Sequence, residues 1–280
     1  MENLGYYNGI FGLIEEMVIP MNDRVHFFGD GVYDATFSAN HVVYLIEEHI
    51  DRFFNSAEQI KITIPHTKAE VKAILEEMAA MVEAEESFVY WQVTRGTAPR
   101  NHAFPDTKAN FWITVTPFEL RNIKERMALT AMEDTRHLHC NIKTLNLLPS
   151  VMASQKASEE GCQETVFYRG DIVTECAHSN VSILKDGMLK THPNDRYILP
   201  GIAKSHLIIA CKALKIPVDE TAFTMSEMEA ADEIIVTSSS NFCSAVKTLK
   251  GRPVGGKAPK LIEVIQDYLV AEFRVYCGLE

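Results

Sequence analysis

Near the N-terminus, hydrophobic and polar residues alternate on both sides of Asn8-Gly9, which is the pattern of two antiparallel strands joined by a tight turn. From residue 45 to 60 the apolar positions change to helical spacing. A second helical pattern begins at Thr67, where Glu70 completes a capping box. We therefore expect the chain to open with a hairpin followed by two helices.

Two runs rich in aromatic and β-branched residues, 88–94 and 110–116, predict strands. The loop between them, residues 95–107, contains glycine and proline and is long enough to be functional. The polar segment 117–124 contains a proline and is the candidate domain junction. The expected domains are therefore residues 1–120 and 121–280.

Beyond this junction, helical and strand patterns follow one another without regular alternation. The expected order is strand 127–132, helix 147–160, strands at 165–168, 180–184 and 188–191, helix 202–214, strand 233–238 and helix 259–276. Such an order favours an α+β fold over a doubly wound parallel sheet.

Composition narrows the class of protein. With 280 residues, 46% of them hydrophobic, the chain can fill the core of one large or two medium domains. The formal net charge of −11 argues against a nucleic-acid-binding surface, which needs clustered Lys and Arg. The six scattered cysteines form no CxxC pair, and no apolar run approaches the roughly 18 residues of a membrane span. We expect a cytoplasmic protein with no nucleic-acid or membrane partner and no metal site.

Lys143 is a candidate for covalent chemistry. A lysine that forms an imine must be held on a short, partly desolvated turn, so that its amine can lose a proton near neutral pH. Lys143 has uncharged neighbours on both sides and an apolar run after it, where Asn146 could cap a helix. A solvated surface charge is the alternative, so the interpretation depends on partners elsewhere in the chain.

Three later segments supply such partners. Glu175 follows a strand-like run and could pair with the ring nitrogen of a pyridine cofactor. Residues 199–203 turn at Gly201 and begin a helix whose N–H groups could bind phosphate, and the hydroxyls of 237–241 offer a second contact. The alternatives are a surface glutamate, a helix start without an anion and an ordinary polar turn. Together the segments outline a site for pyridoxal 5′-phosphate (PLP).

These segments belong to a longer series of motifs that resembles the fold-type IV PLP-dependent aminotransferases, and among them the bacterial D-amino acid aminotransferases, along nearly the whole chain. The shared motifs are at 28–33, 49–52, 93–97, 99–102, 142–146, 174–175, 179–181, 198–199, 201–202 and 236–238. The resemblance implies two domains, a smaller N-terminal α/β sandwich and a larger C-terminal β-barrel-like domain with helices.

The resemblance also implies a role for individual residues. Lys143 would hold PLP covalently and move the proton at the substrate Cα, and Glu175 would pair with the pyridine nitrogen. The other cofactor-binding residues would be Arg52, Leu199, Ile202, Ala203 and Ser239. The substrate carboxylate would be bound by Tyr33, Arg100 and His102, the last two reaching across from the second subunit of an obligate homodimer.

The Arg100-x-His102 pair discriminates within the fold type, because a guanidinium binds a carboxylate through two parallel hydrogen bonds. Branched-chain aminotransferases and aminodeoxychorismate lyases resemble the chain in Lys143 and Glu175 but generally lack this pair. The expected activity is amino transfer from a D-amino acid such as D-alanine to 2-oxoglutarate, a 2-oxo acid. The alternatives are an (R)-selective amine transaminase, an aminodeoxychorismate lyase and a degenerate PLP-binding protein.

Some positions depart from the family. Ala203 stands where a threonine is common, which removes one hydroxyl contact to phosphate, and Cys176 and His178 replace small residues near the glutamate. His178 is either a rim residue or alters the hydrogen bonding around Lys143.

Overall fold

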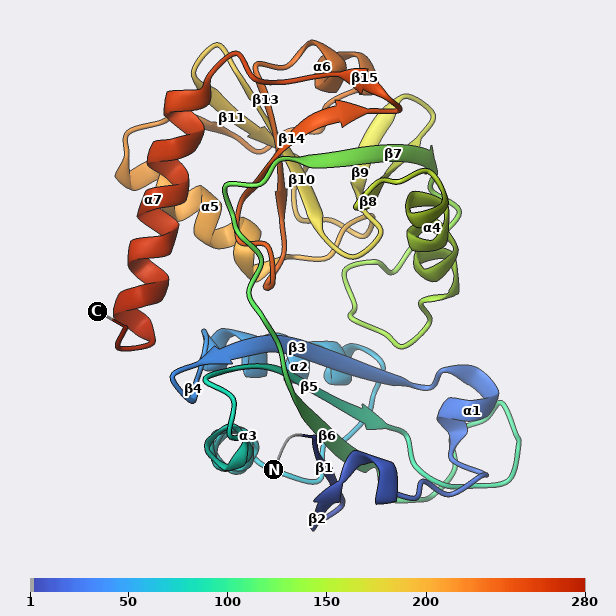
Figure 1. Ribbon diagram of the computed structural model, residues 1–280. Coiled ribbons are helices and arrows are strands. Elements are labelled where there is room, and N and C mark those ends of the chain that lie inside the picture. The colour runs from blue at the N-terminus through green and yellow to red at the C-terminus, as the bar shows by residue number, and fades with distance from the viewer. Residues whose placement is uncertain (1–2, 280) are drawn as a thin grey trace. The chain divides into compact units, whose positions relative to one another are not determined.

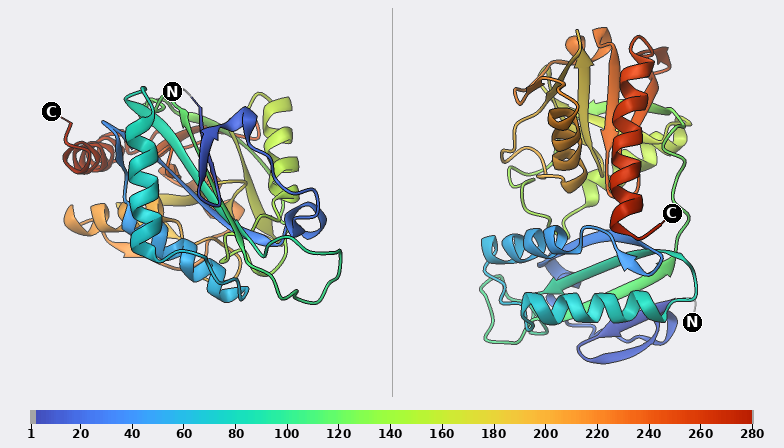
Figure 2. Two further views of the ribbon diagram at one scale, coloured as in Figure 1. Left: turned by 90° about the horizontal axis from the view of Figure 1, so that it is seen from below. Right: turned by 90° about the vertical axis from the view of Figure 1, so that its left-hand side faces the viewer.

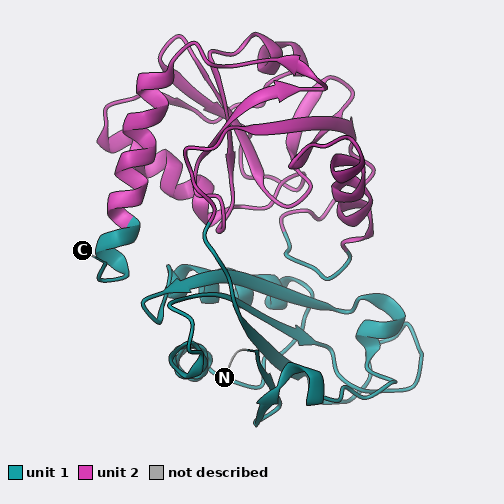
Figure 3. Ribbon diagram, in the orientation of Figure 1, with its two compact units in different colours: residues 1–120, 142–146, 273–280 teal, residues 121–141, 147–272 magenta. Residues whose placement is uncertain are grey.

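The computed structural model describes residues 3–279, which divide into two units (Figure 3). The first unit contains residues 1–120 together with two later segments, 142–146 and 273–280. The second contains residues 121–141 and 147–272. The segment that carries Lys143 therefore lies with the N-terminal part of the chain.

The predicted hairpin begins the first unit. Strands β1 (Leu4–Tyr7) and β2 (Ile10–Leu13) pair antiparallel, and Asn8 and Gly9 both have positive φ in the turn between them. The hairpin lies at the edge of a six-stranded antiparallel sheet in the order β2-β1-β6-β5-β3-β4 (Figure 1). Its other strands are β3 (Gly31–Ala39), β4 (Val42–Val43), β5 (Glu86–Thr94) and β6 (Asn110–Pro117).

Two helices, α2 (Ile46–Gln59) and α3 (Lys68–Met81), pack against this sheet through one apolar core. Both were predicted, and the capping box between Thr67 and Glu70 is present in both directions. Two short elements were not predicted, the 3₁₀ turn η1 (Ile14–Glu16) and helix α1 (Arg24–Phe28).

The second unit is built on a nine-stranded mixed sheet. The order is β12-β11-β10-β13-β14-β7-β8-β9, with β15 paired to β14. Three pairs are parallel, namely β7 with β8, β7 with β14, and β11 with β12. The strands are β7 (Met127–Glu133), β8 (Glu164–Arg169), β9 (Ile172–Cys176), β10 (Asn180–Lys185), β11 (Met188–Thr191), β12 (Val218–Asp219), β13 (Glu233–Thr237), β14 (Ser244–Leu249) and β15 (Arg252–Pro253).

Helices cover this sheet in separate places. Helix α4 (Leu148–Glu159) packs on β7 and β8, whereas α5 (Ile202–Ala213) and α7 (Pro259–Tyr276) share a core with β10, β13 and β14 (Figure 2). The short helix α6 (Met225–Ala230) packs into a further cluster around β10 and β13. The α+β fold is confirmed. Among residues 3–279 no helix has both the length and the apolar character needed to cross a bilayer.

Candidate functional site

The predicted site residues are distributed over both units. Tyr33, Arg52, Arg100, His102 and Lys143 belong to the first, and Glu175, Leu199, Ile202, Ala203 and Ser239 belong to the second.

Lys143 lies on a half-buried turn whose backbone is bound to the first unit. Its N–H donates to Oγ of Ser56 on α2 at 3.3 Å, and its carbonyl accepts from the N–H of Tyr33 at 3.0 Å. The lysine Nζ is 4.3 Å from the centroid of the Tyr33 ring. The turn thus brings the amine of Lys143 next to one of the residues predicted to bind substrate.

Asn146 does not cap α4, contrary to the prediction. Helix α4 begins after Leu147 without a side-chain cap, and Nδ2 of Asn146 instead donates to the carbonyl of Gly29 at 3.1 Å. Gly29 has a φ of 60°, and a Cβ at this position would lie 2.9 Å from Oδ1 of Asn146. Asn146 therefore fixes the lysine-bearing segment to the turn between α1 and β3.

Arg52 belongs to a buried cluster with Asp34 and His49. Its Nε and Nη2 donate to the two carboxylate oxygens of Asp34 at 2.9 and 2.7 Å, and Nδ1 of His49 is 2.8 Å from the same carboxylate. Burial alone would raise the pKa of Asp34, but Arg52 and His49 hold it below its usual range. Arg52 is therefore held by a carboxylate that is ionised at neutral pH.

Arg100 and His102 lie on the exposed loop between β5 and β6, and both approach Phe28 at the end of α1. The guanidinium carbon of Arg100 is 5.2 Å from the Phe28 ring centroid, and the His102 ring is 5.0 Å from it. Tyr33, the third predicted substrate residue, stacks on Tyr90 with 5.4 Å between ring centroids. The loop therefore gathers the arginine and the histidine on one aromatic support.

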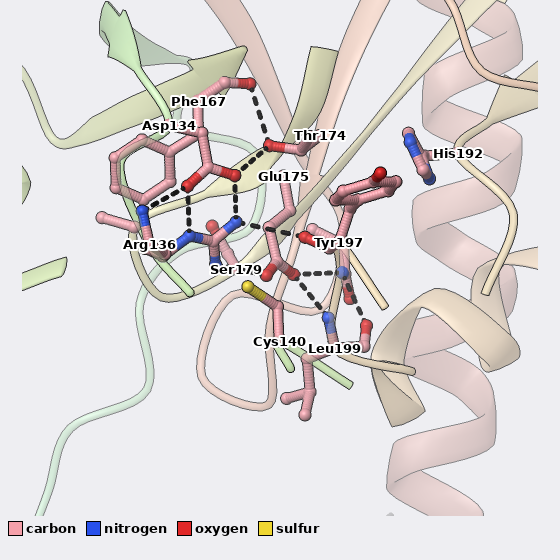
Figure 4. Close-up of polar contacts among 12 residues, drawn as sticks. Asp134, Arg136, Cys140, Phe167, Thr174, Glu175, Ser179, His192, Tyr197 and Leu199 are labelled. Atoms are coloured by element: carbon pink, nitrogen blue, oxygen red, sulfur yellow. Dashed lines mark hydrogen bonds and ion pairs between the residues drawn. The ribbon is translucent and has the colours of Figure 1, made fainter. Parts of the chain in front are cut away.

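In the second unit, Glu175 is buried at the end of β9 and bound on both carboxylate oxygens (Figure 4). Oε1 is 2.5 Å from Nη1 of Arg136, and Oε2 accepts from Nδ2 of Asn180 at 2.9 Å and from the N–H of Leu199 at 3.0 Å. Burial raises the pKa of Glu175 to about 7, although the positive charge of Arg136 acts to lower it. Three hydrogen-bond donors thus fix the orientation of the carboxylate.

Sequence reasoning missed Asp134 and Arg136. Nε and Nη2 of Arg136 donate to the fully buried carboxylate of Asp134, both at 2.9 Å. Asp134 also accepts from Nε of Arg169 at 3.1 Å and from Oγ1 of Thr174 at 3.0 Å. Figure 4 shows Arg136 between the two carboxylates. The only signal in the sequence is the pair Asp134-x-Arg136 directly after a predicted strand.

The N-terminus of α5 has the features of an anion site. Gly201 is its N-cap and supplies no side-chain hydrogen bond, so the N–H groups of the first turn, at Ile202 and Ala203, are not capped. A Cβ on Gly201 would lie 1.9 Å from Oδ1 of Asn180, so the backbone approaches this side chain as closely as only glycine allows.

Hydroxyl groups lie at the end of β13, the strand next to β10, and in the turn after it. Asn180 is paired with Thr237 in this ladder, and Oγ1 of Thr237 is buried without a hydrogen-bond partner among the described residues. Ser239 is half-buried in the turn that follows. A buried hydroxyl without a partner loses free energy unless something binds it, so this group suits a phosphate ligand.

Two of the positions that depart from the family, His178 and Ala203, lie in the turn between β9 and β10 and in the first turn of α5. Nδ1 of His178 is 2.9 Å from Oε2 of the buried Glu164, while about half of the histidine side chain, 54%, remains exposed. Glu164 also accepts from Oγ of Ser179 at 2.7 Å. Ala203 is half-buried in the first turn of α5. His178 is therefore part of the hydrogen bonding of the turn between β9 and β10.

The sequence matches the family described as Amino-transferase class IV over residues 31–249. The chain belongs to the class IV aminotransferases. Two similar members are the D-alanine aminotransferases of Listeria monocytogenes serotype 4b, 37% identical over 94% of both chains, and of Staphylococcus haemolyticus, 33% identical over 94% of this chain and 95% of that one. The predicted resemblance to fold-type IV aminotransferases is confirmed.

Solved structures of the family show the same fold. The branched-chain amino acid aminotransferase of Escherichia coli matches 100% of this chain and 97% of its own, with a TM-score of 0.89 at 19% identity. The branched-chain aminotransferase of Thermoproteus uzoniensis with norvaline matches 99% of this chain and 95% of its own, with a TM-score of 0.88 at 22% identity. At these identities the likeness concerns the fold alone.

Proposed function

We propose that this class IV aminotransferase is a PLP-dependent D-amino acid aminotransferase. It transfers the amino group of a D-amino acid such as D-alanine to 2-oxoglutarate and yields pyruvate and D-glutamate. The observation that carries the proposal is the similarity, at 37% identity over 94% of the chain, to a protein named D-alanine aminotransferase. The Arg100-x-His102 pair supports the same activity. We further propose a cytoplasmic homodimer, and the six free cysteines are consistent with a reducing compartment.

The second unit has groups that fit PLP. The N–H groups of Ile202 and Ala203, which no side chain caps, suit its phosphate, as do the hydroxyl of Ser239 and that of Thr237, which has no hydrogen-bond partner among residues 3–279. Glu175 would hold the ring nitrogen, and Leu199 would support the ring. When bound, PLP supplies an electron sink that stabilises negative charge at the substrate Cα.

Residues of the first unit would hold the cofactor and move the proton. Lys143 would bind PLP covalently through its amine before substrate arrives. Once the substrate's amine has displaced it, the freed lysine amine would take and return the proton at Cα. The half-buried turn that carries it supports this role, since it limits the positions that Nζ can reach. Arg52 would contribute its positive charge to the phosphate, with its orientation fixed by Asp34.

The α-carboxylate shared by amino-acid and 2-oxo-acid substrates would be bound by Tyr33, Arg100 and His102. The guanidinium of Arg100 can donate two parallel hydrogen bonds to a carboxylate, and His102 adds a donor at a second angle. In the proposed dimer these two residues serve the site of the other subunit.

The test is a comparison of amino donors with the purified, PLP-loaded protein. D-alanine and L-alanine are each supplied with 2-oxoglutarate, and pyruvate and the configuration of the glutamate formed are measured. An (R)-amine and aminodeoxychorismate are supplied in parallel, and Lys143→Ala is the inactive control. We expect pyruvate and D-glutamate from D-alanine. Preference for L-alanine, for the amine or for aminodeoxychorismate would refute the proposal.

A further inference from the structure

The two ends of the loop between β5 and β6 are in contact with each other, whereas its tip, residues 99–104, is exposed to solvent. Gly96 has a φ of 105°, and a Cβ on it would lie 2.0 Å from the carbonyl oxygen of Lys108, so the two ends of the loop are in contact. Oγ1 of Thr107 donates to the carbonyl of Thr97 at 3.2 Å across the same base. Residues 99–104, which include Arg100 and His102, are all exposed.

Arg24, the first residue of α1, reaches this exposed tip from a buried position. Its side chain is only 3% exposed, and Nη1 donates to the carbonyl of Asn101 at 2.5 Å and to that of Ala103 at 3.5 Å. These are the two carbonyls on either side of His102. Among the described residues, the backbone of residues 99–104 makes one other hydrogen bond, and it lies within this segment: the N–H of Ala103 donates to Oδ1 of Asn101.

Arg24 is itself held in place by Asp30. Its Nε donates to Asp30 at 2.7 Å, and Asp30 also accepts from Nε of Arg95 at 3.0 Å. Arg95 donates in turn to the carbonyls of Ile60 and Lys61 at the end of α2, and its guanidinium carbon is 3.6 Å from the ring centroid of Phe104. The Arg24 guanidinium, which binds the tip of the loop, is thus oriented by the carboxylate of Asp30. Asp30 is in turn bound by Arg95, which is hydrogen-bonded to the end of α2.

We infer that Arg24 is a positioning residue for the substrate-carboxylate site. Its buried guanidinium holds the backbone on both sides of His102, and thereby sets where Arg100 and His102 present their donors. The inference rests on the proposed function, because it assigns these two residues to the substrate carboxylate. A planar guanidinium can bind one carboxylate and two carbonyls at fixed angles, whereas the single ammonium of a lysine cannot reproduce that geometry.

The experiment compares Arg24→Met and Arg24→Lys with a matched control, Arg126→Met. Arg126 also binds a carboxylate, that of Glu233, and a backbone carbonyl, that of Val246, but it belongs to the second unit, whereas the loop belongs to the first. The first measurement is the rate at which trypsin cleaves the Arg100–Asn101 bond in the folded, cofactor-free protein, with fragments identified by mass. The second is the steady-state kinetics with D-alanine and 2-oxoglutarate.

We expect Arg24→Met to be cleaved at this bond at least about tenfold faster, because release of the tip makes local opening easier. We expect its kcat/KM to fall by roughly ten- to a hundredfold, more through KM than through kcat, because misplaced binding groups cost that much. Arg24→Lys should give cleavage rates and kcat/KM values between those of Arg24→Met and the unmodified protein. If Arg24→Met does not fold, the comparison is made with Arg24→Lys alone. Arg126→Met should change neither.

Unchanged cleavage in both Arg24 variants would overturn the inference, as would faster cleavage with unchanged kcat/KM. If the unmodified protein does not act on D-alanine, the proposed function fails and so does the assignment of the tip to a substrate carboxylate. Proteolysis would then still decide whether Arg24 holds the loop, so the two failures are distinguishable.

Discussion

At the scale of single residues, two opposing effects act on the pKa of Glu175, burial and the positive charge of Arg136. In its proposed role as partner of a protonated ring nitrogen Glu175 would have to be ionised, yet burial disfavours the ionised form and raises its pKa to about 7. Arg136 counteracts part of this effect and also fixes one oxygen, at 2.5 Å. The arginine is in turn bound by Asp134, so its charge is compensated when no cofactor is present.

The raised pKa predicts how the stability of the cofactor-free protein depends on pH. The folded state binds the proton of Glu175 more tightly than the unfolded state, so the stability that this group contributes is complete below about 4.5 and is lost as the pH rises through about 7. The loss is about 3 kcal/mol, at roughly 1.36 kcal/mol per pH unit. Glu175→Gln, which cannot ionise, should therefore gain stability relative to the unmodified protein between pH 5 and pH 8 in urea unfolding. A difference that does not change with pH would contradict this.

Arg100 offers a prediction about substrate class. Arg100→Ala removes charge-assisted hydrogen bonds worth roughly 1.5 to 3 kcal/mol each, so kcat/KM should fall by about tenfold to several hundredfold. The loss should appear with D-alanine and with 2-oxoglutarate, which both carry an α-carboxylate, and be small in the half-reaction of an (R)-amine. Wild-type kcat/KM for D-alanine in this variant would remove Arg100 from the carboxylate site.

Single residues also show what the sequence could and could not predict. Lys143 and Glu175 were found because each lies in a recognisable motif. Arg136 is one of 27 Lys and Arg residues, and its importance depends on packing between the ends of β7 and β9, which no local pattern records. The same holds for Arg24, which meets Asn101 only because α1 is folded against the base of a distant loop.

At the scale of elements, long periodic segments were predicted well and short ones were not. Helix α2, with 14 residues, and the C-terminal helix α7, with 18, have apolar stripes over about four and five turns, and both were predicted to within a residue or two. Helix α1 has five residues, too few for a periodic pattern, and the apolar run of β14 is interrupted by the exposed Lys247 and by Thr248. Asn146 was assigned as a helix cap, but its tertiary hydrogen bond to Gly29 prevails over that local preference.

The start of α5 carries a prediction for the phosphate site. Gly201 has an ordinary φ of −71°, so alanine fits its backbone conformation, but the added Cβ would lie 1.9 Å from Oδ1 of Asn180. Asn180 would have to move and give up its bonds to Glu175 and to the carbonyl of Leu199. Gly201→Ala should therefore lose about 1 to 3 kcal/mol of unfolding free energy and bind PLP more weakly.

Equilibrium titration of the cofactor-free protein with PLP measures this change. Asn180→Ala is the matched variant, because it removes the same hydrogen bonds without the steric overlap. If Gly201→Ala binds PLP as tightly as the unmodified protein does, the close approach of Gly201 to Asn180 has no part in cofactor binding.

At the scale of the whole molecule, two segments join the first unit although they follow residue 120 in the sequence. Residues 142–146 do so through Ser56, Tyr33 and Gly29, and the end of α7 through Phe273, whose ring contacts Phe37 and Tyr44. A sequence divided at its polar linker cannot reveal this, since both segments are bound by contacts between residues far apart in the chain. Lys143, the lysine predicted to react, therefore belongs to the same unit as Arg52 and as the loop between β5 and β6 that carries Arg100.

The proposed homodimer makes a prediction that involves the entire assembly. If Arg100 serves the site of the other subunit, a heterodimer of Lys143→Ala and Arg100→Ala chains contains one intact site, with Lys143 from one chain and Arg100 from its partner. Equal co-expression should give about half heterodimers by random pairing, each with one of two sites intact, and hence about a quarter of the unmodified activity with D-alanine. Each variant alone should be far less active.

If Arg100 instead serves its own subunit, no heterodimer site is intact, and the mixture would not exceed the residual activity of Arg100→Ala. Differently tagged chains, purified on both tags in sequence, isolate the heterodimer and raise its expected activity to about half.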